Sequence, residues 1–125
     1  MKKVVSTKNA PEAIGPYSQA IEVNGMLFIS GMLPIDPTTG NFVPGGIKEQ
    51  TEQIFINIKA VLSAAEMNIG HVVKTTVFLS DISLFDCMNQ VYATQFKDSF
   101  PARSTLAVKT LPKNALVEIE VIAVK

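Results

Sequence analysis

The C-terminal segment Val117–Val124 constrains the fold of this 125-residue chain more than any other feature. Successive side chains of a strand point to opposite faces of its sheet. One face of this segment is wholly apolar and consists of Val117, Ile119, Val121 and Ala123. The other face is half acidic and half apolar and consists of Glu118, Glu120, Ile122 and Val124. The segment therefore predicts a strand with one face in the core, and we expect its second face to meet another copy of the chain.

Turn signals and hydrophobic periodicity divide the remaining chain into strands and two helices. Asn24-Gly25 predicts a two-residue hairpin, because both residues tolerate a positive φ. Gly70 is the expected stop of the first helix, and Ser83 with Asp86 fits a loose capping box at the start of the second. The expected strands are 4–5, 18–23, 26–32, 72–79, 103–108 and 117–124, and the expected helices are 47–66 and 84–97.

This order, β-β-β-α-β-α-β-β, predicts a single α+β domain that covers residues 1–125. Crossovers of one hand place both helices on the same face of the sheet. The opposite face is then left uncovered in a single chain. Charged residues make up 18 % of the chain, against about 25 % in an average domain. This shortfall also indicates that some surface is hidden in an oligomer.

Composition excludes several classes of function. Eleven basic and eleven acidic residues give a net charge of zero, so the chain lacks the basic surface that nucleic acid or anionic lipid requires. One Cys and one His allow neither an internal disulfide nor the usual Cys/His metal site. No apolar run approaches the ~18 residues that span a bilayer, and no signal-peptide pattern is present. We expect a cytoplasmic protein with no membrane partner.

Arg103 is the only arginine among 11 basic residues. A guanidinium can bind a carboxylate through two parallel hydrogen bonds, which a lysine cannot do. Strand alternation places Arg103 and Thr105 on one face. If the last two strands lie side by side, Glu118 and Glu120 come within reach of Arg103. The pattern therefore allows either a carboxylate-binding site or a cross-strand ion pair that only holds the sheet.

Three further side chains could take part in chemistry. Glu118 and Glu120 share one strand face, where they could act as acid and base or form a solvated surface. Tyr17 lies between turn-forming residues and could line a pocket or simply pack.

Other candidates favour structural roles. We expect Cys87 to be a buried structural cysteine, and we expect no role in catalysis for His71. The glycine pair before Lys48 lacks the spacing of a phosphate loop and predicts only the start of a helix.

Several segments together resemble the RidA family of reactive intermediate deaminases, also called the YjgF family. The resemblance covers essentially the whole chain in order. The matching segments are Ala13–Ala20, Phe28–Gly31, Asp36-Pro37 with Gly40, Val73–Leu79, Pro101–Leu106, Lys109, Leu111 and Val117–Ile119.

The resemblance implies a chorismate-mutase-like fold, with helices on one face and the sheets of a homotrimer forming a barrel-like core. It implies active sites in the clefts between subunits, and hydrolysis of 2-imino acids and their enamine tautomers to 2-keto acids and ammonia. Expected substrates are 2-aminoacrylate, 2-iminopropanoate and 2-iminobutanoate. No cofactor or metal is implied.

The resemblance also implies roles for individual residues. Arg103 would bind the substrate carboxylate, and Glu118 would position or activate the attacking water. Tyr17 of a neighbouring subunit would line the cleft. The remaining substrate-binding candidates are Gly31, Thr105, Asn89 and Tyr92.

Two positions depart from the family pattern. Many members have Cys where this chain has Thr105, which removes any role for a thiol. Many have Gln where this chain has Met32, which puts the polar contacts of the pocket in doubt.

Two alternative functions remain open from the sequence. Relatives described as translation inhibitors or ribonucleases raise an RNA-directed role, although zero net charge argues against it. A keto-acid-binding or chaperone-like protein could use the same cleft without turnover.

Overall fold

The Asn24-Gly25 turn sets the register of the first hairpin. Both residues have positive φ, 52° and 76°, as a two-residue turn between antiparallel strands requires. The turn joins β2 (Ala20–Val23) to β3 (Met26–Met32), and β1 (Lys3–Val5) pairs antiparallel with β2. The predicted hairpin is confirmed in the computed structural model, which describes all residues 1–125.

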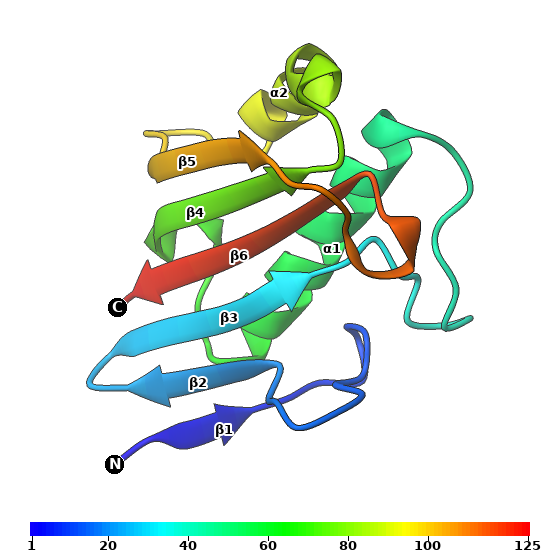
Figure 1. Ribbon diagram of the computed structural model, residues 1–125. Coiled ribbons are helices and arrows are strands. Elements are labelled where there is room, and N and C mark those ends of the chain that lie inside the picture. The colour runs from blue at the N-terminus through cyan, green and yellow to red at the C-terminus, as the bar shows by residue number, and fades with distance from the viewer.

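Six strands form one sheet in the order β1-β2-β3-β6-β4-β5 (Figure 1). The central strand β6 (Val117–Val124) is antiparallel to both β3 and β4 (Val72–Leu79). β5 (Ala102–Ala107) runs parallel to β4 at the edge. The last two strands, β5 and β6, do not lie side by side, so the condition for a contact between Arg103 and the glutamates of β6 is not met. The crossover through a helix places β5 on one side of β4, and β6 takes the other side.

Both helices cover the same face of the sheet (Figure 1). The longer helix α1 (Ile47–Ala64) buries the predicted apolar stripe, which includes Ile54, Ile58, Val61 and Leu62. The shorter helix α2 (Phe85–Thr94) buries Met88, Val91 and Tyr92. The predicted order of elements and the one-sided cover by helices are therefore confirmed.

The ends of the helices differ from the sequence-based expectations. Glu66, with φ of 59°, ends α1, because its N–H donates to the Ser63 carbonyl at 2.9 Å in a left-handed terminal turn. Gly70 lies beyond this turn in the short 3₁₀ helix Ile69–His71, so it does not stop the helix.

The start of α2 also differs. The Asp81 carboxylate accepts a hydrogen bond from the Ser83 N–H at 2.8 Å and caps the 3₁₀ helix Ile82–Leu84. No side chain caps α2 itself, so the expected capping box of Ser83 with Asp86 is wrong. The helix ends at Thr94, three residues before the expected end.

The faces of β6 divide as predicted. The inward residues Val117, Ile119, Val121 and Ala123 are buried in the core between sheet and helices. The other face is open, and it continues across the sheet into large exposed apolar side chains. Phe28 lies opposite Ile122 and is 40 % exposed, and Leu106, opposite Phe78, is 42 % exposed. None of the helices combines the length and the apolar character that crossing a membrane requires.

Candidate active site

Glu118 projects from β6 into a cavity of about 640 Å³ on the open face of the sheet. Tyr17 and Gly31 line the same cavity, so three of the expected site residues come together in one chain. A side chain at position 31 would place its Cβ 2.9 Å from Cδ of Glu118. Gly31 is therefore needed because the Glu118 carboxyl group lies directly against the backbone of β3.

The Glu118 carboxylate forms no ion pair, since the single salt bridge of the chain joins Lys125 to Glu22. Burial raises the pKa of the Glu118 carboxyl above its ordinary value, and the nearby Glu120 carboxylate raises it further. An unpaired carboxylate with a raised pKa is a better proton acceptor than an ordinary surface glutamate. The arrangement suits a general base.

Glu120→Gln should shift the pH dependence of any activity that needs ionised Glu118. The change removes the second cause of the raised Glu118 pKa and leaves burial, the larger cause, in place. The pKa of Glu118 then falls, so the acidic limb of the pH–rate profile moves to lower pH. Rates measured from pH 4 to 8 test this, and an unchanged or upward-shifted limb contradicts it.

Arg103 lies in a second, separate group of residues. It stands opposite Thr75 in the β4–β5 ladder, so its side chain shares the helix-covered face with Thr75. Its Nη1 donates to the Asn89 Oδ1 at 2.7 Å. The guanidinium carbon lies 4.6 Å from the Tyr92 ring centroid and 5.6 Å from that of Phe85.

These contacts hold the guanidinium while leaving most of its donors free. The Tyr92 hydroxyl shares a hydrogen bond with Thr75 Oγ1 at 2.7 Å, which fixes the ring beneath Arg103. Burial raises the pKa of Tyr92, so the phenol stays neutral. Only one of the guanidinium N–H groups is used by Asn89, and the others can still bind a carboxylate.

The structure refines the expected roles of Asn89 and Tyr92. The family resemblance implied substrate binding for both, and in the single chain both contact Arg103. Phe85 and Thr75 take part in the same group and were missed by sequence reasoning. Thr75 is a polar residue on the buried face of a strand, and this break in alternation is the signal that could have found it.

Arg103 and Glu118 do not meet in one chain. Glu118 lies opposite Phe78 on the open face of the sheet, whereas Arg103 faces the helices from the edge strand. β4 separates their two strands. The interpretation of Arg103 with Glu118 or Glu120 as an ion pair across neighbouring strands is therefore wrong.

Thr105 follows Arg103 by two residues on the same face of β5. Its Oγ1 is the only buried side-chain nitrogen or oxygen in the chain without a hydrogen-bond partner. The other departure from the family pattern, Met32, is 5 % exposed and belongs to the hydrophobic core. Its apolar side chain is explained by packing.

Thr105→Val should increase stability. An unsatisfied buried hydroxyl costs free energy that an apolar group of similar shape does not, by about 1–3 kcal/mol. Urea denaturation of the assembled protein measures the difference, with Thr105→Ser as the control that keeps the hydroxyl. A lower free energy of unfolding for Thr105→Val would mean that the hydroxyl finds a partner outside the single chain.

The structure also places the residues for which the sequence analysis expected no part in catalysis. Cys87 is exposed, so the expectation of a buried cysteine is wrong. It lies one position before the buried Met88 and faces away from the apolar stripe of α2. His71 Nδ1 accepts a hydrogen bond from the Asn68 N–H at 3.0 Å and closes a local turn. Gly46 is the N-cap of α1, as the helix-start interpretation predicted.

Comparison with known proteins gives consistent results. The family described as "Endoribonuclease L-PSP" matches residues 7–125. A RutC family protein of Pyrococcus horikoshii is 54 % identical over 125 residues, which are 100 % of this chain and 99 % of the relative. The 2-iminobutanoate/2-iminopropanoate deaminase of Bos taurus is 49 % identical over 125 residues, covering 100 % of this chain and 91 % of the relative.

Solved structures agree over the whole fold. A Rid family protein from Yersinia pestis superposes with a TM-score of 0.97 at 53 % identity, covering 100 % of both chains. E. coli TdcF with bound serine has a TM-score of 0.94 at 39 % identity, covering 98 % of each chain. By sequence and by fold, the chain belongs to the RidA (YjgF) family.

Proposed function

We propose that the protein hydrolyses reactive 2-imino acids and their enamine tautomers to 2-keto acids and ammonia. The substrates we propose are 2-aminoacrylate, 2-iminopropanoate and 2-iminobutanoate. The observation that carries this proposal is the unpaired Glu118 carboxyl group with a raised pKa, lying in a cavity with Tyr17 and Gly31. The names of the bovine, mouse and human relatives support the same chemistry.

A complete site requires a second copy of the chain. The Glu118 cavity and the Arg103 group lie on opposite faces of one sheet, so a single small substrate cannot contact both within one chain. In the proposed homotrimer, Tyr17, Gly31 and Glu118 of one subunit meet Arg103 of its neighbour. The exposed apolar side chains of Phe28 and Leu106 on the open face support burial of that face between subunits.

The proposed reaction uses orientation and proton transfer. Arg103 binds the substrate carboxylate, while main-chain groups near Gly31 and Thr105 hold substrate and water. With the imine nitrogen protonated, Glu118 accepts a proton as a water oxygen bonds to the imine carbon, which gives a neutral tetrahedral carbinolamine. Glu118 then returns that proton to nitrogen, and as the carbon–nitrogen bond breaks the carbinolamine hydroxyl gives its proton to Glu118, so that the carbonyl forms and ammonia leaves. Orientation supplies most of the gain, and no covalent enzyme intermediate is needed.

Turnover is the direct test of this proposal. Freshly generated 2-aminoacrylate and 2-iminobutanoate are mixed with the protein, and 2-keto acid and ammonia are measured against buffer alone. We expect both products to form faster with the protein present. The same preparation is examined by analytical ultracentrifugation, where we expect a trimer. Release at the uncatalysed rate would reject the proposed activity, and a monomer would reject the shared site.

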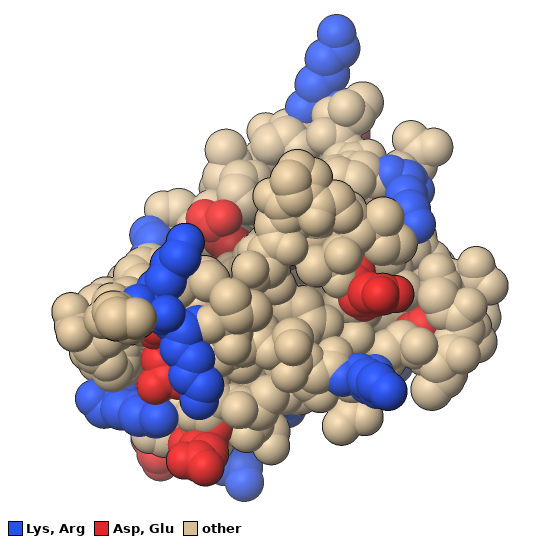
Figure 2. All heavy atoms as spheres, turned by 90° about the horizontal axis from the view of Figure 1, so that it is seen from below, with Lys and Arg blue, Asp and Glu red and all other residues tan.

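An RNA-directed function has weaker support. Lysines on the face seen in Figure 2 either stand apart or lie among acidic side chains, with uncharged surface between them. The chain has a single arginine, so only one guanidinium is available for contacts with phosphates. Salt-sensitive binding of RNA would favour this function. A protein that only binds keto acids needs Arg103 but not Glu118, so turnover separates it from the enzyme.

A further inference from the structure

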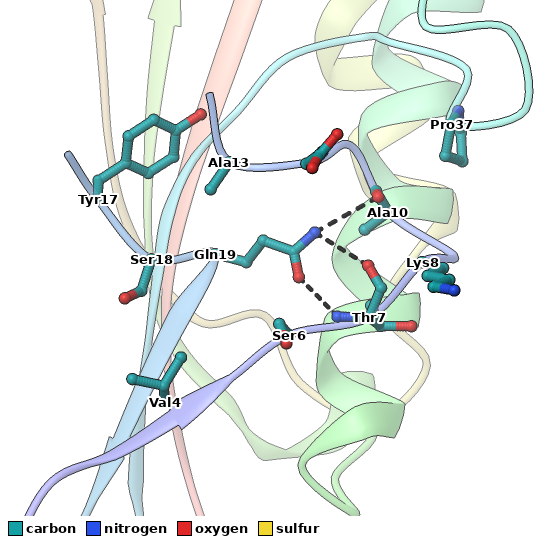
Figure 3. A pocket seen from close by; sticks show the side chains of 11 residues that line it. Val4, Ser6, Thr7, Lys8, Ala10, Ala13, Tyr17, Ser18, Gln19 and Pro37 are labelled. Atoms are coloured by element: carbon teal, nitrogen blue, oxygen red, sulfur yellow. Dashed lines mark hydrogen bonds between the residues drawn. The ribbon is translucent and has the colours of Figure 1, made fainter. Parts of the chain in front are cut away.

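Residues 6–18 form an irregular strap between β1 and β2, and this strap carries Tyr17. On one side the strap borders the Glu118 cavity. On the other it borders a second cavity of about 800 Å³, whose lining is drawn in Figure 3. Tyr17 and Glu12 line both cavities. The strap is thus the wall between them, and its placement decides where Tyr17 stands.

The side-chain amide of Gln19 holds this strap. Its Oε1 accepts a hydrogen bond from the Thr7 N–H at 2.7 Å, and its Nε2 donates to the Thr7 carbonyl at 3.1 Å. The same Nε2 lies 2.7 Å from the Pro11 carbonyl and 3.4 Å from that of Ala10. Gln19 immediately precedes β2, and its amide points into the bend of the strap (Figure 3). The residue is 7 % exposed.

No other hydrogen bond joins residues 6–16 of the strap to the sheet. Ala10 is the one residue of this stretch whose side chain is buried. An irregular segment has main-chain donors and acceptors that no helix or strand satisfies. One buried amide, with both donor and acceptor groups, satisfies several of them at once and so fixes the course of the strap.

The main chain of Gln19 is tied to the floor of the Glu118 cavity. Its carbonyl accepts a hydrogen bond from the Ser30 N–H at 3.0 Å. The Ser30 hydroxyl donates to the Ser18 carbonyl at 2.7 Å. Ser30 immediately precedes Gly31, against which the Glu118 carboxyl group lies. Gln19 therefore connects the strap at one end with the backbone beside Glu118 at the other.

Only the main chain of the strap holds Tyr17 in place. Its side chain forms no hydrogen bond and the residue is 53 % exposed. Its N–H donates to the Gly15 carbonyl at 2.9 Å, and Gly15 has φ of 124°, which favours glycine. The position of the ring is therefore set by the turn and by whatever fixes the strap on either side.

We propose that Gln19 is a positioning residue for Tyr17, holding the strap so that the Tyr17 ring faces the substrate beside Glu118. This proposal rests on the proposed function, in which Tyr17 lines the substrate cleft. Gln19 itself does not line the Glu118 cavity. Its effect on catalysis passes through Tyr17, and that dependence distinguishes a positioning role from a contribution to stability alone.

A double-mutant cycle tests this dependence. Gln19→Met keeps the length of the side chain and removes its hydrogen bonds, and we expect kcat/KM for 2-iminobutanoate to fall ~10-fold or more through misplacement of Tyr17. In a protein that already carries Tyr17→Phe, the hydroxyl is absent. Gln19→Met should then lower kcat/KM by a clearly smaller factor than it does in the wild-type protein. If the fold-loss in kcat/KM of the double variant equals the product of the two single fold-losses, the proposal is overturned.

Gln50→Met is the matched control. Gln50 is also 7 % exposed, and its Oε1 accepts a hydrogen bond from the Leu116 N–H at 2.9 Å, away from the strap. The fold-loss in kcat/KM caused by Gln50→Met should be the same with and without Tyr17→Phe. Equal coupling of Gln50 and Gln19 to Tyr17 would mean a general loss of stability, and would overturn the specific role of Gln19.

A second measurement covers the case of weak or absent activity. Hydrogen exchange of strap amides needs no turnover, and we expect Gln19→Met to speed exchange at residues 7–17. Faster exchange in a protein with no deaminase activity would reject the proposed function alone. Unchanged exchange would reject the role of Gln19.

Discussion

Arg103→Ala is expected to lower kcat/KM for 2-iminobutanoate by roughly 10²–10³-fold, because the substrate loses a bidentate, charge-assisted contact. The variant should still fold, since Arg103 forms no ion pair in the chain and lies on an edge strand. Its loss exposes parts of the Tyr92 and Phe85 rings, which affects packing more than topology. Steady-state kinetics and sedimentation of the same preparation measure both properties.

Arg103→Lys provides the matched variant. It keeps the positive charge but not the fork of donors, so we expect most of the loss to remain. An unfolded or monomeric Arg103→Ala protein would point instead to a structural role for the arginine. Full activity of the lysine variant would show that charge alone suffices and would contradict bidentate binding.

Glu118→Gln should lower kcat by about 10²–10⁴-fold, the usual contribution of a general base. The change keeps the shape of the side chain beside Gly31 and removes its ability to accept a proton. Binding of a 2-keto acid, measured by calorimetry, should persist because Arg103 is intact. Loss of binding together with turnover would mean that Glu118 holds the ligand rather than the attacking water.

The two variants together test whether the site is shared between subunits. Arg103→Ala and Glu118→Gln chains, coexpressed with different affinity tags and purified through both, form mixed oligomers. Each interface joins Arg103 of one subunit to Glu118 of the next, so a trimer that contains both variants has about one third of its sites restored. Mixed oligomers that contain both tags but show no recovery would contradict the shared site.

The local structure of this chain follows closely from its sequence. The alternation of Val117–Val124 predicts the central strand and its inward face, and Asn24-Gly25 predicts the hairpin turn. These features depend on neighbouring residues and on a period of two. The ends of the helices were predicted less well, since Glu66 adopts the left-handed conformation that glycine favours.

The candidate site was predicted in its residues but not in its geometry. The sole arginine and the glutamates of the last strand stand out in the sequence. Their separation onto opposite faces depends on β4 lying between β5 and β6. The order of strands in a sheet arises from long-range pairing, which no local pattern specifies.

The sequence by itself determined the alternating strands, the apolar faces of the helices and the residue types available for binding a carboxylate and moving a proton. Only the tertiary structure decided that Asn89 and Tyr92 hold Arg103, that Gly31 makes room for Glu118, and that Gln19 anchors the strap. Each of these contacts joins residues from different elements. Their distances follow from packing of the whole sheet against its helices, which periodicity along the chain does not encode.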